Sequence, residues 1–410
     1  MRTRLRAALA AVALCSASTL SAQTLSLQDA ITRAIAASPL GAATTARRDV
    51  LSASRALADT RPAASVDVTA ENLGVGGRDL NRQVQFTASY SQRLERGGKR
   101  AARIALAEGD IAVADAEAMV RRLDIVTNVQ RLYVEVQGAQ AAIRNARERV
   151  DIASAAQREV QRRVDGARDP LFAGTRARTQ LAEARVDLEL AEHARDAALS
   201  RLTALWGGAA QGLAVDDDDF LAFDRASAAS GMSAAELAVF EARRRRSDAT
   251  IALERSNAVS DPTISAGPRY IGTGDVAVVA GVSFPLRNRR RATASLARAL
   301  AEQRQIDADL AVERYQRAQA ISLAAQRVEE SRHEAEAVRD RVLPGARRTL
   351  SEVRAGYARG GFSFLDVSTA QRDLAAAHTR MIAAATRYHQ AGVELDRLTG
   401  RFIPLVQEAR

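Results

Sequence analysis

Few side chains in this sequence of 410 residues could build a reactive or metal-binding site. Its histidines, His193, His333, His378 and His389, include no pair at the helical spacing of metal ligands, and its single cysteine is Cys15. Neither a phosphate-binding loop nor a Gly-x-Ser-x-Gly motif is present. The sequence therefore predicts no catalysis, no cofactor and no bound metal.

Two charged features need separate interpretations. Asp216 to Asp219 has the composition of an acidic metal site, but a solvated linker or cap is the interpretation we favour. The net charge is +10, and removing the three leader arginines leaves 10 − 3 = +7. Because many other arginines stand near acids at helical spacing, as Arg185 does near Glu189, they predict a solvated helix surface. We therefore expect no nucleic-acid partner.

Residues 1–22 have the pattern of a secretory signal peptide. A basic start is followed by the apolar run Ala7 to Cys15 and by the small residues Ser21 and Ala22. Cleavage before Gln23 would also remove the only cysteine. We therefore expect an exported chain without a disulfide framework.

The rest of the chain contains an internal duplication. Leu181 to Gly207 matches Leu374 to Gly400 without a gap, at an offset of 374 − 181 = 193 residues. Each half begins with a capping-box pattern, at Ser26 and at Ser233. The expected organisation is a first repeat at 23–214 (helix, strand pair 63–95, hairpin 97–207), a linker at 215–232, and a second repeat at 233–410 (helix, strand pair 262–287, hairpin 288–400).

Each repeat contains two short segments in which apolar and polar residues alternate. Val84 to Tyr90 and Val276 to Phe284 place their apolar side chains on one face, as membrane-barrel strands do. A half-buried soluble sheet is the alternative. Four strands cannot close a barrel, and open strand edges are not tolerated in hydrocarbon. If the strands lie in a membrane, several chains must share a barrel, and three chains would supply twelve strands.

The helical segments are too long for a compact domain. No proline occurs between Pro62 and Pro170, and Leu286 to Leu343 contains neither proline nor glycine. A helix of about 60 residues spans roughly 90 Å. The returning segment repeats apolar residues every seven positions, from Leu374 to Leu395, which predicts a coiled coil. The fold class expected is mainly α with membrane β: two tandem repeats, each a long antiparallel helical hairpin with a two-stranded ribbon.

Basic residues cluster where each ribbon enters its long helix. Arg96, Lys99 and Arg100 form the first cluster, and Arg287 with Arg289 to Arg291 forms the second. Cations at a helix N-terminus oppose its dipole, so another partner should favour them. We expect anionic lipid head groups at the periplasmic rim of a barrel to be that partner.

This order of elements resembles the TolC family of outer-membrane factors. Leu25 to Pro39 looks like the family's opening helix, Ala198 to Gly207 like its repeat ending, and Gly360 to Gln371 like its periplasmic turn. Gln92 to Arg103 is most similar to the branch that serves cobalt–zinc–cadmium resistance pumps. The resemblance covers nearly all of residues 25–400.

The resemblance implies a homotrimer with a twelve-stranded outer-membrane barrel on a periplasmic α-helical tunnel. Its partners would be a periplasmic adaptor protein and an inner-membrane pump. The chain would be the passive exit duct of that system, with metal cations as the expected cargo. Carried over residue by residue, the entrance constriction comprises Asp366, Tyr357 and Thr369, and the adaptor-docking residues are Gly360, Gly361, Ser363, Leu365, Gly166, Asp169 and Pro170.

Some positions depart from the family pattern, and alternatives remain. Thr369 stands where the family's type member has a second acid, and Phe362 where it has an arginine. Asp366 could form an anionic ring with its copies, or it could only cap the turn. The rival functions are a periplasmic adaptor or coiled-coil interaction protein, or the same channel serving drug efflux or type I secretion.

Overall fold

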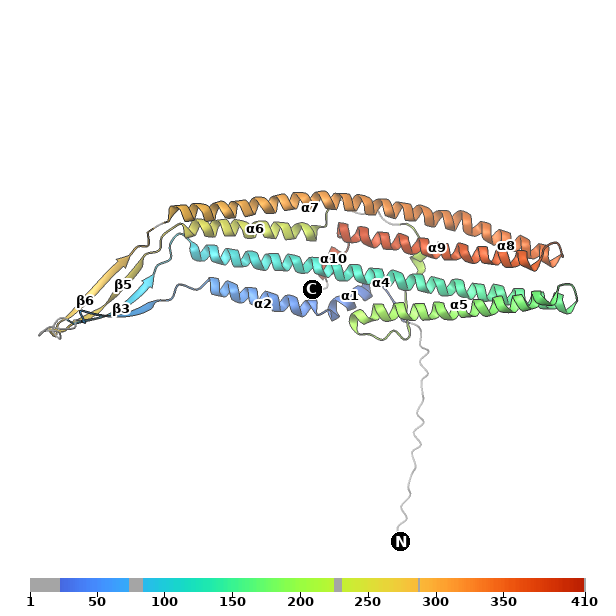
Figure 1. Cartoon of the computed structure of the whole chain (residues 1–410), viewed down its shortest axis with the longest axis horizontal. Helices are drawn as coiled ribbons and strands as arrows, with labels where there is room; N and C mark the ends of the chain where they lie inside the picture. Colours follow the sequence, from blue (N-terminus) through green and yellow to red (C-terminus); the bar gives the residue numbers. More distant parts are fainter. Residues whose placement is uncertain (1–22, 74–83, 225–230, 287, 409–410) are drawn as a thin grey trace, which may run out of the picture.

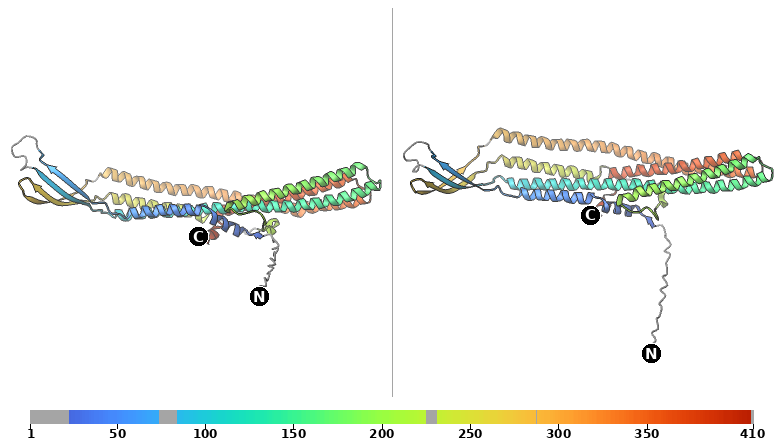
Figure 2. Two further views of the ribbon diagram at one scale, coloured as in Figure 1. Left: turned by 90° about the horizontal axis from the view of Figure 1, so that it is seen from below. Right: turned by 60° about the horizontal axis from the view of Figure 1, so that its bottom comes forward.

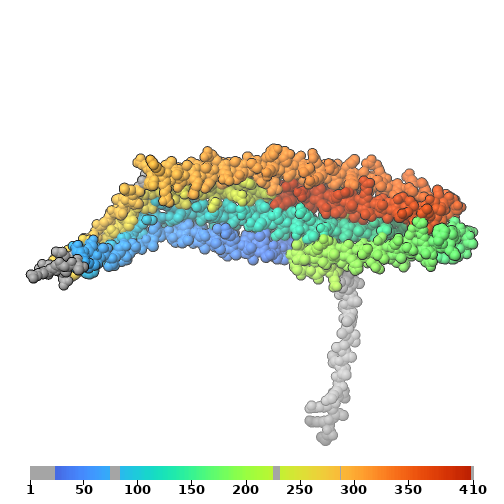
Figure 3. All heavy atoms as spheres, in the orientation of Figure 1, coloured from blue at the N-terminus to red at the C-terminus, as the bar shows by residue number. Residues whose placement is uncertain are grey.

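The protein is a long, narrow, gently curved layer of helices that ends in a β-sheet (Figures 1 and 3). The computed structural model describes residues 23–73, 84–224, 231–286 and 288–408. The expected signal peptide, the glycine-rich turn at Gly74 to Gly77 and Arg287 lie outside these residues. None of the helices within the described ranges combines the length and the hydropathy needed to cross a bilayer.

The first repeat begins with a short helix because Pro39 interrupts the helical run. Ser26 caps α1, since its hydroxyl accepts a hydrogen bond from the backbone of Asp29. The elements are β1 Gln23–Leu25, α1 Leu27–Ala37, α2 Leu40–Ala58, β2 Ser65–Glu71, β3 Gln85–Arg93, α4 Lys99–Asp165 and α5 Leu171–Thr203. With 67 residues, α4 is about 100 Å long.

The first repeat ends with a short 3₁₀ turn (η1 Ala204–Trp206) and a strand (β4 Leu213–Val215). A second 3₁₀ turn in the linker (η2 Asp218–Leu221) leads to the second repeat. That repeat comprises α6 Ala234–Asn257, β5 Thr263–Ile271, β6 Val276–Ser283, α7 Arg289–Ala337, a π-turn η3 Val338–Val342, α8 Leu343–Ala358, α9 Phe364–Thr399 and α10 Ile403–Glu408. The two repeats of hairpin and ribbon confirm the expected fold class.

Two details of the second repeat differ from the sequence prediction. The long helix is not regular, because it widens into the π-turn just before Pro344, whose ring would clash with the carbonyl four residues earlier. The capping box expected at Ser233 does not form. Its hydroxyl makes no hydrogen bond within the described chain, and the Glu236 carboxylate instead lies 3.0 Å from Arg397 and 3.1 Å from Arg317.

The four long strands form one antiparallel sheet in the order β2-β3-β5-β6. The register places Val66 opposite Tyr90, Tyr90 opposite Ala266 and Ala266 opposite Ala280, so the apolar side chains of all four strands share one face. That face is exposed, with Val68 at 74% and Val278 at 82% of full accessibility. The opposite face carries polar side chains, including Arg269, which donates hydrogen bonds to Thr87 and Gln85.

Helix α4 runs along the whole helical layer, and α7, η3 and α8 together do the same. Helices α2 and α5 lie along α4, and α6 and α9 lie along the α7–α8 rod, each pair nearly end to end (Figures 1 and 2). The seven-residue repeat of α9 is buried against its neighbours, at Leu374, Met381, Tyr388 and Leu395. The spacing seen in the sequence therefore marks the packing face of this helix.

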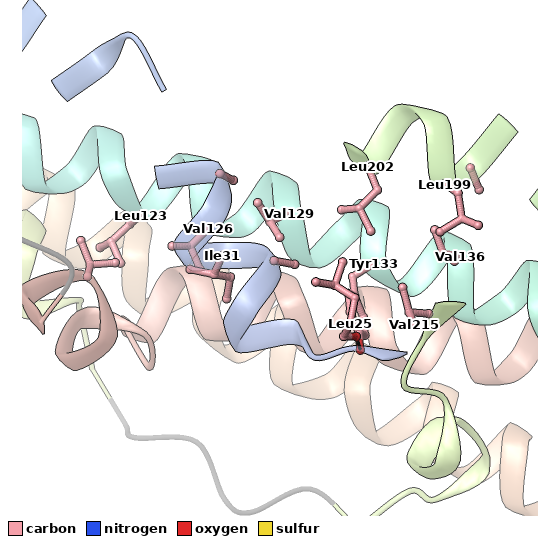
Figure 4. Packing of buried hydrophobic residues seen from close by; sticks show 14 of the residues in the cluster. Leu25, Ile31, Leu123, Val126, Val129, Tyr133, Val136, Leu199, Leu202 and Val215 are labelled. Atoms are coloured by element: carbon pink, nitrogen blue, oxygen red, sulfur yellow. Dashed lines mark hydrogen bonds between the residues drawn. The ribbon is translucent and has the colours of Figure 1, made fainter. Parts of the chain in front are cut away.

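One cluster of buried side chains ties the N-terminus and the linker to α4. Leu25 and Val215, from the parallel pair β1 and β4, pack with Tyr133 (Figure 4). The Tyr133 hydroxyl donates to the carbonyl of Leu25 at 2.9 Å. Further along the linker, Phe220 and Phe223 pack on α9, where Tyr388 donates to the carbonyl of Phe223. The linker thus contacts both hairpins at mid-length.

Candidate functional site: the hairpin tips

The two helical hairpins turn at the same end of the layer, opposite the sheet (Figure 1). The first turn joins α4 to α5 through Gly166 and Pro170, and the second joins α8 to α9 through Gly360 and Ser363. Gly360 has a φ of +84°, a conformation that glycine adopts at little cost. These turns carry most of the residues assigned to the entrance and to adaptor docking.

A charged and aromatic cluster joins the two tips, and we call Arg163, Asp169 and Tyr357 the tip latch. The Arg163 guanidinium lies 3.1 Å from Oδ2 of Asp169 and donates to the carbonyl of Tyr357 at 3.0 Å. The Tyr357 hydroxyl donates to the same carboxylate, and the guanidinium lies 4.5 Å from the centre of its ring. Tyr357 is 4% exposed. The structure therefore brings an expected entrance residue and an expected docking residue into one contact.

The latch alters the ionisation of both acidic partners. Burial alone would raise the pKa of Asp169, but hydrogen bonds from Arg163 and Tyr357 outweigh burial and lower that pKa below its ordinary value. Burial and the hydrogen bond to Asp169 raise the pKa of Tyr357. At neutral pH the latch therefore consists of a carboxylate, a guanidinium and a neutral phenol.

Asp366 begins α9 and forms a capping box with Ser363. The Ser363 hydroxyl and backbone N–H both donate to Oδ2 of Asp366, at 2.7 and 2.9 Å. In return, the backbone N–H of Asp366 donates to the Ser363 hydroxyl. The hydroxyl hydrogen bond is the main cause that lowers the pKa of Asp366. The carboxylate is therefore exposed, charged at neutral pH and fixed in direction.

Comparison with known sequences identifies the family. The outer membrane efflux protein family matches residues 30–208 and 232–401, which cover most of both repeats. The chain belongs to this family. Membership makes it an outer membrane efflux protein and not an enzyme, in agreement with the organisation expected from the sequence.

This efflux protein is similar to several curated proteins. It is 29% identical over 322 residues to the cobalt-zinc-cadmium resistance protein CzcC of Cupriavidus metallidurans. The matched region covers 77% of this chain and 77% of CzcC. It is 26% identical over 249 residues to the nickel-cobalt-cadmium resistance protein NccC of Alcaligenes xylosoxydans xylosoxydans. This match covers 59% of this chain and 57% of NccC.

Solved structures share its fold. The outer membrane protein VceC of Vibrio cholerae has a TM-score of 0.68 at 17% identity, covering 91% of this chain and 96% of VceC. CusC, whose crystal structures concern folding and transmembrane channel formation, has a TM-score of 0.67 at 16% identity, covering 90% and 91%. The efflux protein therefore has the same two-repeat fold as these proteins.

The remaining predicted tip residues are distributed around the turns. Thr369 is exposed on α9, and its hydroxyl accepts a hydrogen bond from Arg372 at 3.2 Å. Leu365 is half exposed, and Gly361 is exposed in the second turn. Within the described contacts, none of these three residues joins the latch.

The sequence placed four further residues in the docking turns without giving them a role. Arg163 is distinguished from the other arginines only by the approach of the second hairpin. Three apolar side chains project from the turns: Leu171, Phe172 and Phe362 are 80%, 70% and 49% exposed. Apolar residues inside a turn were the signal that could have identified them.

The structure also describes the acidic linker and possible metal ligands. Asp217 forms an ion pair with Arg144, and the carbonyl of Asp216 accepts hydrogen bonds from Tyr133 and Gln137. Across the described ranges, no three His, Cys, Asp or Glu side chains are grouped so that they could hold a metal ion. The aspartate run therefore joins the linker to α4.

The two basic clusters differ in how far the chain itself neutralises them. Lys99 lies 2.6 Å from Asp261 and is largely buried, and Arg100 lies 2.6 Å from Asp59. Arg96 uses its backbone N–H to bind Asp261. Arg289, Arg290 and Arg291 are exposed, and no residue that the structure describes forms an ion pair with them. The second cluster thus presents three exposed cationic side chains to an outside partner.

Proposed function

We propose that this efflux protein is the trimeric exit duct of a tripartite efflux system and passively conducts heavy-metal cations out of the cell. The observation that carries the proposal is the two-faced sheet at one end of the helical layer. An exposed apolar face more than one strand wide matches a lipid environment, and the polar face with Arg269 matches a water-filled lumen.

The open edges of one chain support a trimer. The sheet ends at β2 and β6, whose outer edges have no partner strand among the described residues. The helical layer has apolar side chains along both borders, including Val312 and Tyr315 on α7, and Val186 and Leu190 on α5. When one border of a chain contacts the opposite border of the next chain, copies related by rotation close into a ring. Three copies would combine twelve strands in one barrel above one helical tunnel.

The tips would contact a periplasmic adaptor linked to an inner-membrane pump. Exposed Leu171 and Phe172 on the first turn, with Phe362 and Leu365 on the second, provide apolar anchors. Gly360 and Gly361 have no side chain that would hinder an approaching hairpin. The tip latch would hold the hairpins together in the resting channel, and release of the latch would widen the entrance.

Metal cations are the cargo that two observations support. The named relatives are resistance proteins for cobalt, zinc, nickel and cadmium. In addition, three copies of the exposed Asp366 around one axis would place carboxylates at the narrow entrance, where a passing cation relieves their repulsion. Drug efflux remains the alternative, and it would require the same duct with a different pump.

The purified protein and a deletion strain test the proposal. We expect heat-modifiable trimers in outer-membrane fractions, ion conductance in planar bilayers, and loss of resistance to cobalt, zinc or cadmium on deletion. A monomer that does not conduct would overturn the channel proposal. Sensitivity to drugs, with unchanged metal tolerance, would retain the channel and reject the metal cargo.

A further inference from the structure

Helices α5 and α8 form the two borders of the helical layer in the half that carries the tips (Figure 1). Across this half, α5 packs on α4, α4 packs on α9, and α9 packs on α8. The side of each border helix that faces away from its neighbour is exposed. Val186 on α5 is 52% exposed, and a Cβ added to Gly345 on α8 would meet no atom of the chain. Both borders therefore have room for another helix.

The outward side of α8 carries two positive charges and then a negative charge toward the tip. Leu343 and Leu350 pack against α9, and a helix turns by about 100° per residue, so the outward positions can be read from these two. All four outward residues are exposed. We call them the α8 strip, which begins in the adjoining π-turn: Arg341, Gly345, Arg348 and Glu352.

The outward side of α5 has the opposite sequence of charges. Ala177 packs with Val160 of α4, and Ala184 is buried on the same side of α5. The outward side and its two flanks therefore contain exposed residues that we call the α5 strip: Arg178, Glu183, Val186 and Glu189. Within the described ranges, none of the six charged side chains of the two strips forms an ion pair. Their charges are thus available to a partner.

Opposite charges on the two strips lie at matching distances from the tips. In order from the tip, the pairs are Glu352 with Arg178, Arg348 with Glu183, and Arg341 with Glu189. Distances are counted from Ala358, the last residue of α8, and from Leu171, the first residue of α5. They are 358 − 352 = 6 against 178 − 171 = 7, 358 − 348 = 10 against 183 − 171 = 12, and 358 − 341 = 17 against 189 − 171 = 18. At 1.5 Å per residue, the members of a pair differ in height by at most about 3 Å.

The contact between the two repeats inside one chain is a precedent for pairing these strips. There the long helix α4 of the first repeat packs on the returning helix α9 of the second. Ion pairs cross this contact, with Arg131 3.5 Å from Glu394 and Arg397 2.7 Å from Asp124. The α7–α8 rod is the long helix of the second repeat, and α5 is the returning helix of the first. Duplication therefore favours the same kind of contact between the second repeat of one copy and the first repeat of the next.

We propose that the α8 strip binds the α5 strip of the neighbouring copy, with three ion pairs of alternating sign and with Val186 of that copy seated on Gly345. The inference rests on the proposed trimer. Rotation about an axis along the layer keeps every residue at its height, so charges that match within one chain also match between copies. Exposed ion pairs contribute little stability, but opposed like charges are costly, so the pattern fixes the register between copies.

Disulfide cross-linking of the full-length protein in outer membranes tests the contact. The only cysteine, Cys15, lies in the expected signal peptide, so introduced cysteines report on one contact. A disulfide requires Cα atoms about 4.4–6.8 Å apart. Oxidised Val186→Cys/Gly345→Cys should give covalent dimers and trimers on denaturing gels, and neither single variant should. Val186→Cys/Ala355→Cys, whose second cysteine lies about 15 Å nearer the tip, is the matched control and should remain uncrosslinked.

Trimers that form without the Val186–Gly345 cross-link, or an equal cross-link in the Ala355 control, would overturn the pairing of the strips. Absence of trimers in the wild type would instead contradict the proposed channel.

Charge exchange tests the register independently of cross-linking. Glu189→Arg places like charges opposite Arg341 and should lower the temperature at which the trimer dissociates. Glu189→Arg combined with Arg341→Glu should restore that temperature. Asp151→Arg, exposed on α4 and so not on a border helix, is the control for added positive charge. An unchanged temperature in Glu189→Arg, or no recovery in the double variant, would overturn the register.

Discussion

Tyr357 on α8 donates a hydrogen bond to Asp169 in the first turn, across 188 residues of sequence. This contact joins the tips of two hairpins that belong to different repeats. Arg163 binds the same carboxylate and covers the same ring. Because the three groups are mostly withdrawn from water, each partner depends on the others, and loss of one should weaken the whole latch.

Removal of the latch carboxylate should open the resting channel. A hydrogen bond to a charged group contributes about 1.5–3 kcal/mol, which is roughly a 10- to 100-fold change in an equilibrium. We expect Asp169→Asn and Tyr357→Phe to raise open probability in planar bilayers by about that factor. Asp165→Asn, at the C-terminal end of α4 and outside the latch, is the matched control. Equal conductance of all three variants would show that the latch does not gate the entrance.

The latch should also respond to strong acid. Because the pKa of Asp169 is lowered in the latched state, the latch is fully stable above the ordinary aspartate pKa of about 3.9 and loses stability as pH falls through the lowered value. Conductance should therefore rise below about pH 4. Asp169→Asn should lack this rise, and its persistence would assign the rise to another carboxyl group.

The charge of Asp366 can be separated from its capping role. Asp366→Asn removes the charge, while its amide oxygen can still accept from Ser363. We expect lower cation preference and weaker divalent block, with trimers intact. Asp366→Ala should show the same loss of selectivity and also a less stable α9 start. If ion selectivity is unchanged in both variants, the carboxylate only caps the turn.

Side-chain bulk at Gly360 should interfere with docking but not with conduction. A tyrosine there would project from the turn at a strained φ of +84°. Gly360→Tyr should therefore abolish metal resistance in cells while single-channel conductance stays unchanged. Gly360→Asn, which tolerates positive φ and is small, should retain most resistance. Normal adaptor capture by Gly360→Tyr would remove the second turn from the docking surface.

The exposed arginines at the start of α7, which form no ion pair with any described residue, should matter for assembly in the membrane. Reversal of Arg289, Arg290 and Arg291 to glutamate should lower the yield of outer-membrane trimers, because anionic head groups would repel the new charges. Export to the periplasm should continue. Arg304→Glu, exposed further along α7, serves as the control for added negative charge. An unchanged trimer yield would exclude a role for lipid contacts at this rim.

The sequence alone determined the architecture, because the positions of strands, helices and helix breaks depend on local residue periodicity. The alternation of Val66, Val68 and Ala70, the seven-residue spacing from Leu374 to Leu395, and the proline at residue 39 each act over a few residues. Strand faces, helix seams and helix breaks follow from such patterns without knowledge of distant partners. The duplication then showed that the same unit occurs twice.

Only the tertiary structure decided which residues meet across the two hairpins. Nothing near Arg163 in the sequence indicates that its guanidinium will lie over the ring of Tyr357. In the same way, nothing near His378 indicates that Glu148 will lie 3.4 Å from its Nε2. Ser233 shows the converse, since a local capping pattern failed when Arg317 and Arg397 attracted Glu236. Long-range electrostatics and desolvation depend on how α4, α8 and α9 pack, and that packing is absent from any local pattern.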